Sequence, residues 1–191
     1  MAVSGRYTIV LDACVLYPRL LRDVLLSLAH ADLYTARWTA EIEREWAQAL
    51  LRNKPGSEST IAHAIEHMRI AIPDCLITGY EQLIMALQLP DPNDRHVLAA
   101  AIRGNADAIL TFNTKDFPQQ VLDGFGIELQ TPDQFVLNQI MLSPARALAA
   151  IKKMRERWQK PEMTAKEMVA LFEQRQLGQT ASHLMDALDL I

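Results

Sequence analysis

At residues 7–12 the chain reads YTIVLD, a short apolar run that ends in an acid. Residues 7–11 do not alternate between apolar and polar side chains, and the run is too short for a helix. It therefore predicts a strand covered on both faces, as in a parallel sheet. Ligands of open α/β sheets bind beyond the carboxyl ends of such strands, so Asp12 lies where chemistry is expected.

The segments that follow predict alternating helices and strands up to about residue 135. Apolar residues recur at helical spacing over residues 19–30, and residues 34–38 are short enough for a second strand. Further helices are predicted over about residues 39–52, 57–72, 91–103 and 118–122, and further strands over 106–111 and 127–130, the last at a sheet edge. This order predicts an α/β domain over residues 1–135.

From residue 132 onward the sequence contains only helical patterns. They cover about residues 132–142, 145–158, 165–174 and 179–188. We therefore predict an all-helical C-terminal extension over residues 136–191, which docks on the first domain or on a partner.

The composition indicates an ordinary globular protein, with 50% hydrophobic and 6% aromatic residues in 191. Cys14 and Cys75 have no paired spacing, and no charged-then-apolar leader precedes the first strand, so we expect a cytoplasmic, reduced protein. No apolar run approaches the length of a membrane span.

Charge is unevenly distributed around the overall net value of -4. Residues 1–135 carry 11 basic and 17 acidic side chains, whereas residues 136–191 carry 8 and 6. Six basic residues surround Trp158, namely Arg146, Lys152, Lys153, Arg155, Arg157 and Lys160. They form either a solvated helix face or a strip that contacts phosphates, for which Lys152, Lys153 and Arg155 are the candidates.

Two acids stand at the start of the predicted helix DPNDRHVLAAAI, residues 91–102. Asp91 can be the N-cap and Asp94 the third helical residue, so capping alone could explain both. Asp94 also shares a helix face with Leu98 and Ala101, which must pack on the sheet. A carboxylate directed there is costly unless it is paired or binds a metal, which favours a functional role for Asp94.

Other oxygen donors lie on a helix and in a loop. Glu43 and Glu45 flank opposite sides of one apolar helical stripe, so helical geometry does not choose between them, and either could be a solvated charge. The loop TFNTKDF, residues 111–117, follows a strand and contains Thr111, Asn113 and Asp116, although it could be a simple turn. Oxygen donors without a His/Cys cluster suit Mg²⁺ or Mn²⁺ better than zinc. We interpret His63 and His67 as exposed histidines.

Together, four segments resemble a PIN-domain ribonuclease and, more narrowly, the VapC-type toxins of bacterial toxin–antitoxin pairs. They are IVLDACVL at residues 9–16, IEREW at 42–46, DPNDRHVLAAA at 91–101 and ILTFNTKDF at 109–117. The resemblance covers roughly residues 6–135. It implies a Rossmann-like parallel sheet flanked by helices, with Mg²⁺ or Mn²⁺ in an acidic pocket at the strand ends. The helical tail looks like the extension of some longer relatives.

The resemblance implies roles for particular residues. It makes Asp12, Glu45, Asp94 and Asp116 catalytic and Asp12, Asp94 and Asp116 metal ligands. Thr111 is similar to a polar residue that often joins the family's site. Asn113 departs from relatives with an acid there, which leaves open whether Asp116 binds metal directly or through water. RNA as substrate, a cognate antitoxin that fills the cleft, and homodimers are further implications.

Other classes of function compete with this interpretation. A haloacid-dehalogenase-type phosphatase expects a second acid two residues after the first, whereas here Ala13 and Cys14 follow Asp12. A degenerate PIN domain could be a non-catalytic RNA- or protein-binding module, although retention of all four acids speaks against it. A PIN nuclease of RNA processing would lack the neighbouring antitoxin of a toxin.

Overall fold

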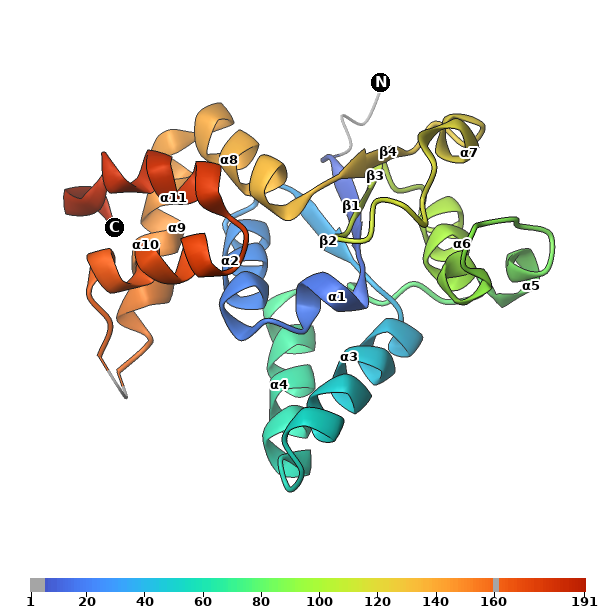
Figure 1. The fold of residues 1–191 in the computed structure, drawn as a ribbon, viewed down its shortest axis with the longest axis horizontal. Helices are drawn as coiled ribbons and strands as arrows, with labels where there is room; N and C mark the ends of the chain where they lie inside the picture. Colours follow the sequence, from blue (N-terminus) through green and yellow to red (C-terminus); the bar gives the residue numbers. More distant parts are fainter. Residues whose placement is uncertain (1–5, 160–161) are drawn as a thin grey trace.

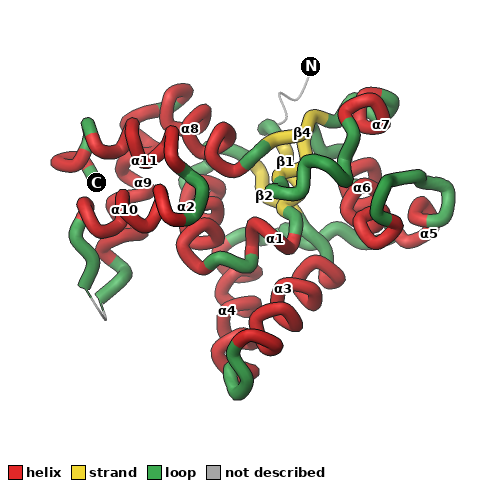
Figure 2. The backbone as a smooth tube through the Cα atoms, viewed as in Figure 1, coloured by secondary structure: helices red, strands yellow, loops and turns green. Residues whose placement is uncertain are grey.

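The fold is built on a four-stranded parallel sheet with strand order β2-β1-β3-β4 (Figures 1 and 2). The computed structural model describes residues 6–159 and 162–191. The strands are β1 (Thr8–Leu11), β2 (Thr35–Arg37), β3 (Ala108–Leu110) and β4 (Glu128–Gln130). The predicted parallel α/β fold is confirmed, with β1 and β3 at the centre of the sheet and β4 at its edge.

The helices lie close to their predicted positions. They are α1 (Ala13–Leu16), α2 (Arg19–His30), α3 (Ala40–Asn53), α4 (Glu58–Ala71), α5 (Glu81–Ile84), α6 (Arg95–Arg103), α7 (Gln119–Asp123), α8 (Pro132–Leu142), α9 (Pro144–Glu156), α10 (Ala165–Gln174) and α11 (Gly178–Met185), with 3-10 turns η1 (Pro92–Asp94) and η2 (Leu188–Leu190). The short helices α1 and α5 were not predicted, because one turn carries too little periodicity. The helix predicted from Asp91 begins with η1.

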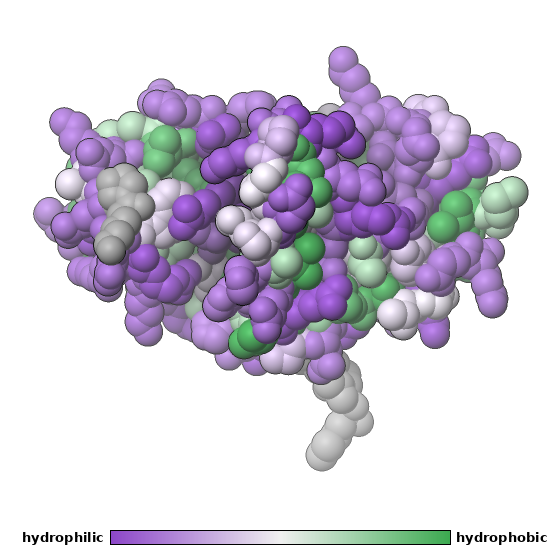
Figure 3. Space-filling model, turned by 90° about the horizontal axis from the view of Figure 1, so that it is seen from below, coloured by the Kyte–Doolittle hydropathy of each residue, from purple (hydrophilic) through white to green (hydrophobic). Residues whose placement is uncertain are grey.

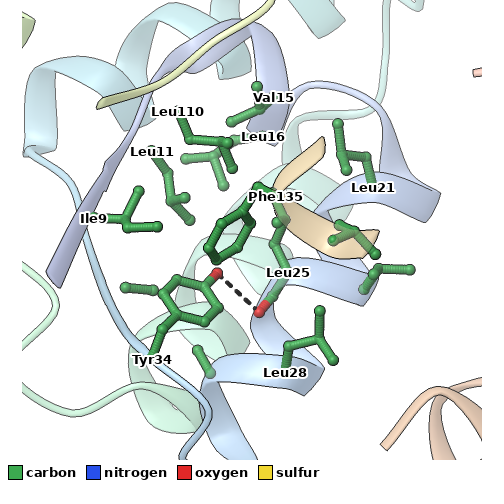
Figure 4. Packing of buried hydrophobic residues seen from close by; sticks show 14 of the residues in the cluster. Ile9, Leu11, Val15, Leu16, Leu21, Leu25, Leu28, Tyr34, Leu110 and Phe135 are labelled. Carbon is green, nitrogen blue, oxygen red and sulfur yellow. Dashed lines mark hydrogen bonds between the residues drawn. The ribbon is translucent and has the colours of Figure 1, made fainter. Parts of the chain in front are cut away.

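The main core lies between the sheet and α2 (Figure 4). Ile9 and Leu11 of β1 point towards the buried leucines of α2. On the same side, the Tyr34 hydroxyl donates to the Leu25 carbonyl at 3.0 Å. The Phe135 ring from α8 meets Tyr34 edge to face, with centroids 4.8 Å apart. Because burying one such side chain contributes about 1.5–3 kcal/mol, Phe135 ties the start of the extension firmly to the core.

The extension docks on the first domain, one of the two predicted arrangements. Helix α9 packs along α2, and the Trp158 indole nitrogen donates to Asp23 at 3.0 Å. Arg157 donates to the Ser27 hydroxyl at 2.8 Å. The proposed division after residue 135 stays a prediction, and α8 crosses it.

Figure 3 shows one face that is largely hydrophilic, with separate apolar patches. Among the residues described, no helix combines the length and apolar character needed to cross a membrane.

Candidate functional site

Asp12 lies at the carboxyl end of the central strand β1, where α1 begins. One carboxylate oxygen accepts from the Ala13 backbone nitrogen at 2.6 Å, which caps α1. The other accepts from the Thr111 hydroxyl at 2.6 Å and from the Cys14 thiol at 3.1 Å. Asp12 is 7% exposed and Thr111 is fully buried. The Asp12 carboxylate is therefore held in one orientation from β1, α1 and the end of β3.

Asp94 closes η1 at the start of α6 and is half-buried. Its side chain caps no backbone nitrogen, whereas Asp91 accepts from the Asn93 backbone at 2.9 Å. Capping therefore explains Asp91 but not Asp94. Burial, followed by the negative charges of Asp12, Asp91 and Asp116, raises the pKa of Asp94 to about 6. These carboxylates are close enough to repel one another.

The loop after β3 brings two more predicted residues to Asp94. The Asn113 backbone nitrogen donates to the Thr111 hydroxyl at 2.9 Å, and the Asn113 amide nitrogen lies 3.4 Å from a carboxylate oxygen of Asp94. The Asp116 backbone N–H donates to the Asn113 carbonyl at 3.3 Å. The Asp116 side chain is half-buried, and its charge helps to raise the pKa of Asp94. The loop is thus a tight turn that also carries site residues.

Glu45 reaches the site from α3 through a histidine of α6. One Glu45 oxygen lies 3.0 Å from Nε2 of His96, a side chain that is almost fully buried. Burial lowers the His96 pKa, but the hydrogen bond and charge of Glu45, with the charges of Glu41 and Asp12, produce a net rise. His96 therefore holds Glu45 on the side of α3 that faces α6.

Glu43 has a different, structural partner set. It is 3% exposed, accepts from the Trp38 indole nitrogen at 2.8 Å and forms an ion pair with Arg69 of α4. Glu43 thus joins α3 to α4, whereas Glu45 contacts His96 of α6. These contacts favour Glu45 of the two glutamates that helical geometry left open, and its catalytic role stays a prediction.

The donor set suits a hard divalent cation, because carboxylate oxygens crowd around a half-buried position. Burial and then the charges of neighbouring carboxylates raise the pKa of Asp94, and a bound cation would favour its charged form. Among the described residues, no three His, Cys, Asp or Glu side chains are already arranged to hold a metal ion. Binding would therefore require side-chain adjustment around Asp12 and Asp94.

The basic segment lies away from this cluster. In Figure 1, α9 is at the left with α10 and α11, while α1, α3 and α6 lie beyond α2. Arg155 donates to the Met163 carbonyl at 2.9 Å, so part of the segment joins pieces of the extension. Lys152 is half-buried and Lys153 exposed, whereas Lys160 lies outside the described residues.

Sequence reasoning missed two contacts of the site. Cys14 touches both Asp12 and Thr111, with its sulfur 3.2 Å from the threonine hydroxyl. His96 contacts Glu45 although 51 residues separate them. The sequence signal for His96 was its place two residues after Asp94 on a helix that had to pack, but its partner could be found only in three dimensions.

The chain is an α/β protein with a parallel sheet and with carboxylates beyond its central strands β1 and β3. The chain belongs to the PIN domain family, which its sequence matches over residues 8–115, and residues 132–186 match the family described as VapC50 C-terminal domain. The predicted PIN resemblance of VapC type, with a helical extension, is confirmed.

A similar protein is "Putative ribonuclease VapC50" from Mycobacterium tuberculosis, 39% identical over 97 residues. The match covers 50% of this chain and 57% of that protein. The chain thus aligns with little more than half the length of this relative. No solved structure matches the chain significantly.

Proposed function

We propose that this protein is a divalent-metal-dependent endoribonuclease and the toxin of a bacterial type II toxin–antitoxin pair. The observation that carries the proposal is the placement of Asp12, Asp94 and Asp116 beyond β1 and β3, where burial and then the neighbouring negative charges raise the pKa of Asp94 to about 6. Membership of the PIN domain family and the similarity to VapC50 support RNA hydrolysis rather than another carboxylate chemistry.

Asp12 and Asp94 are the proposed central ligands of Mg²⁺ or Mn²⁺, and Asp116 is the third, directly or through water. Such an ion, when bound, lowers the pKa of water and offsets charge on the leaving oxygen. Thr111 fixes the Asp12 oxygen to which it donates at 2.6 Å. Asn113 holds an oxygen of Asp94. These contacts limit the reorganisation needed for binding.

We assign to Glu45 the role of orienting the attacking water and accepting a proton from it. The Glu45 side chain is 39% exposed, and one of its carboxylate oxygens contacts the buried His96. That oxygen is therefore fixed in place, while the carboxylate stays accessible to water. A carboxylate positioned in this way accepts a proton without a large loss of freedom.

Cleavage of a labelled RNA pool by the purified chain tests the proposal. We expect cleavage with Mg²⁺ or Mn²⁺, none in EDTA, and none with Asp12→Asn or Asp94→Asn. Asp123→Asn, the same change at an exposed residue of α7, is the matched control and should cut like the wild type. Undiminished cutting after rigorous chelation, or by Asp94→Asn, would refute the metal mechanism. Metal binding without RNA cleavage would instead indicate a degenerate, non-catalytic PIN domain.

The family also supports proposals about partners and compartment. We propose a cognate antitoxin, a homodimer and a cytoplasmic location. An antitoxin should inhibit cleavage when added to the purified chain, which would separate a toxin from a PIN nuclease of RNA processing. Lys152, Lys153 and Arg155 remain proposed RNA contacts, with Arg155 the weakest because it already binds the Met163 carbonyl.

A further inference from the structure

A cavity of about 620 Å³ lies outside the carboxylate cluster, between α2, α4 and the end of the α9 segment. Its polar lining contains three arginines, Arg19, Arg22 and Arg157, and three histidines, His30, His63 and His67. Asp23 is the acidic residue among the lining side chains. Its volume falls in the range of small-molecule and cofactor sites, about 300–1,000 Å³.

The charges in this cavity are not balanced by the protein. The Asp23 carboxylate already accepts from the Trp158 indole and faces three guanidinium groups. Arg22 donates to the Leu16 carbonyl and Arg157 to the Ser27 hydroxyl, which fixes both groups in place. Arg19 is different, because its side chain is 70% exposed, lies over the Trp158 ring and approaches Asp23 no closer than 3.8 Å. A net positive charge therefore remains, with Arg19 among its exposed members.

The remaining lining residues suit a nucleobase. Leu26 and Met68 contribute an apolar floor, and the exposed imidazoles of His63 and His67 stand on one side of α4. Imidazole and guanidinium planes are surfaces on which unstacked RNA bases stack, while guanidinium groups bind phosphate. An acidic peptide would use the cations but not this combination of planar groups and apolar floor.

We propose that this cavity is a second RNA-binding site, which takes the phosphates and bases of single-stranded RNA next to the segment held at the carboxylates. The proposal rests on the proposed ribonuclease function. The two sites are connected through α1, which Asp12 caps and which leads directly into Arg19 at the start of α2. In Figure 1, α1 lies between the start of α2 and the region of α6.

Fluorescence anisotropy with a short labelled single-stranded RNA, in EDTA and across a salt series, tests the proposal. Arg19→Gln and the double variant His63→Gln/His67→Gln should each weaken binding, and the triple variant by about tenfold or more. Arg19→Gln should also reduce the log–log salt slope by about 1, as expected for a lost phosphate contact. All three side chains are exposed, so thermal melting should show an intact fold.

Arg175→Gln is the matched control, because it removes the same charge from an exposed residue after α10. It should bind RNA like the wild type. Equal affinity of the wild type, Arg19→Gln and Arg175→Gln would overturn the proposal. The proposal would also be overturned if the triple variant lost binding to polyglutamate but kept its binding to RNA. That result would indicate a site for acidic protein segments.

The experiment separates this proposal from the nuclease proposal. Binding is measured without metal, so it does not depend on cleavage. A wild type that binds through Arg19 but never cuts RNA would sink the nuclease proposal alone. If the wild type cuts RNA and the triple variant binds RNA with the same affinity as the wild type, only the second site is refuted.

Discussion

Asp94 occupies a position that disfavours its own charge. It is half-buried, caps no helix end, and receives only the long contact from Asn113 at 3.4 Å. Asp12 lies in the same cluster but has two short hydrogen bonds, from Ala13 and Thr111. Neighbouring carboxylates of one site are therefore treated differently by the fold. A bound cation would therefore favour the charged form of Asp94 more than that of Asp12. The stability of an Asp94 variant tests this directly.

Asp94→Asn should raise the melting temperature of the metal-free protein near neutral pH, because it removes a charge that burial and Asp12 disfavour. The folded-state pKa of about 6 lies above the usual value of 3.8. The wild type is therefore most stable, with respect to this group, below the lower value and loses that stability as pH rises through the higher one. The advantage of the variant should shrink as pH falls through that window.

Thermal melts in EDTA across this pH range measure the effect, with Asp123→Asn as the control. A loss of stability in Asp94→Asn at neutral pH would indicate a structural role, such as the capping that the sequence also allowed. A stability difference that ignores pH would contradict the electrostatic explanation.

At the scale of elements, the sequence predicts what repeats locally and misses what depends on distant contacts. Strand β1 and helix α2 were predicted because the apolar pattern of each is complete within the segment. Helix α1 was missed, since a single turn starting at Asp12 has no periodicity to detect. The choice between Glu43 and Glu45 was open for another reason: it depends on Trp38, on Arg69 of α4 and on His96 of α6, and no helical pattern contains those contacts.

Helix α11 depends on a residue of another element. Asp133, in the first turn of α8, accepts from the backbone nitrogens of Gln179 and Thr180 at 2.9 and 2.8 Å, and from the Thr180 hydroxyl. It thus serves as an N-terminal cap supplied from a distance. This long-range cap links the first and last helices of the extension.

Asp133→Ala should destabilise the protein by about 1–2 kcal/mol, because free backbone nitrogens at a helix start then lose their acceptor. For a chain of this size that corresponds to a fall in melting temperature of about 2–4 °C per kcal/mol. Asp133→Asn keeps one acceptor oxygen and should lose less. Asp189→Ala, at an exposed acid of η2, is the control. Equal melting of Asp133→Ala and this control would show that α11 does not need the cap.

At the scale of the whole molecule, the extension is part of the body that supports the site. Phe135 of α8 enters the core on Tyr34, and Trp158 and Arg157 contact α2. Helix α2 follows α1, which Asp12 caps. The sequence predicted helices here but not their contact surface, because no pattern within α2 shows that Asp23 and Ser27 bind side chains 135 and 130 residues away. The extension therefore supports α2, the helix that leads on from α1.

Metal binding should stabilise this whole body, since a ligand that binds only the folded state adds free energy by mass action, about 2.7 kcal/mol at a concentration of 100 times its Kd. We expect millimolar Mg²⁺ or Mn²⁺ to raise the melting temperature of the wild type by several degrees. Asp12→Asn and Asp94→Asn should gain little, although Asp94→Asn starts from a higher value in EDTA, and Asp123→Asn should respond like the wild type. At Asp94, the change in melting temperature distinguishes a ligand from a structural acid: as a ligand, the Asn variant is more stable without metal and less stabilised by it, whereas a structural role makes the variant less stable in both conditions. A wild type whose melting ignores both cations would refute the proposed metal site, whatever activity the protein shows.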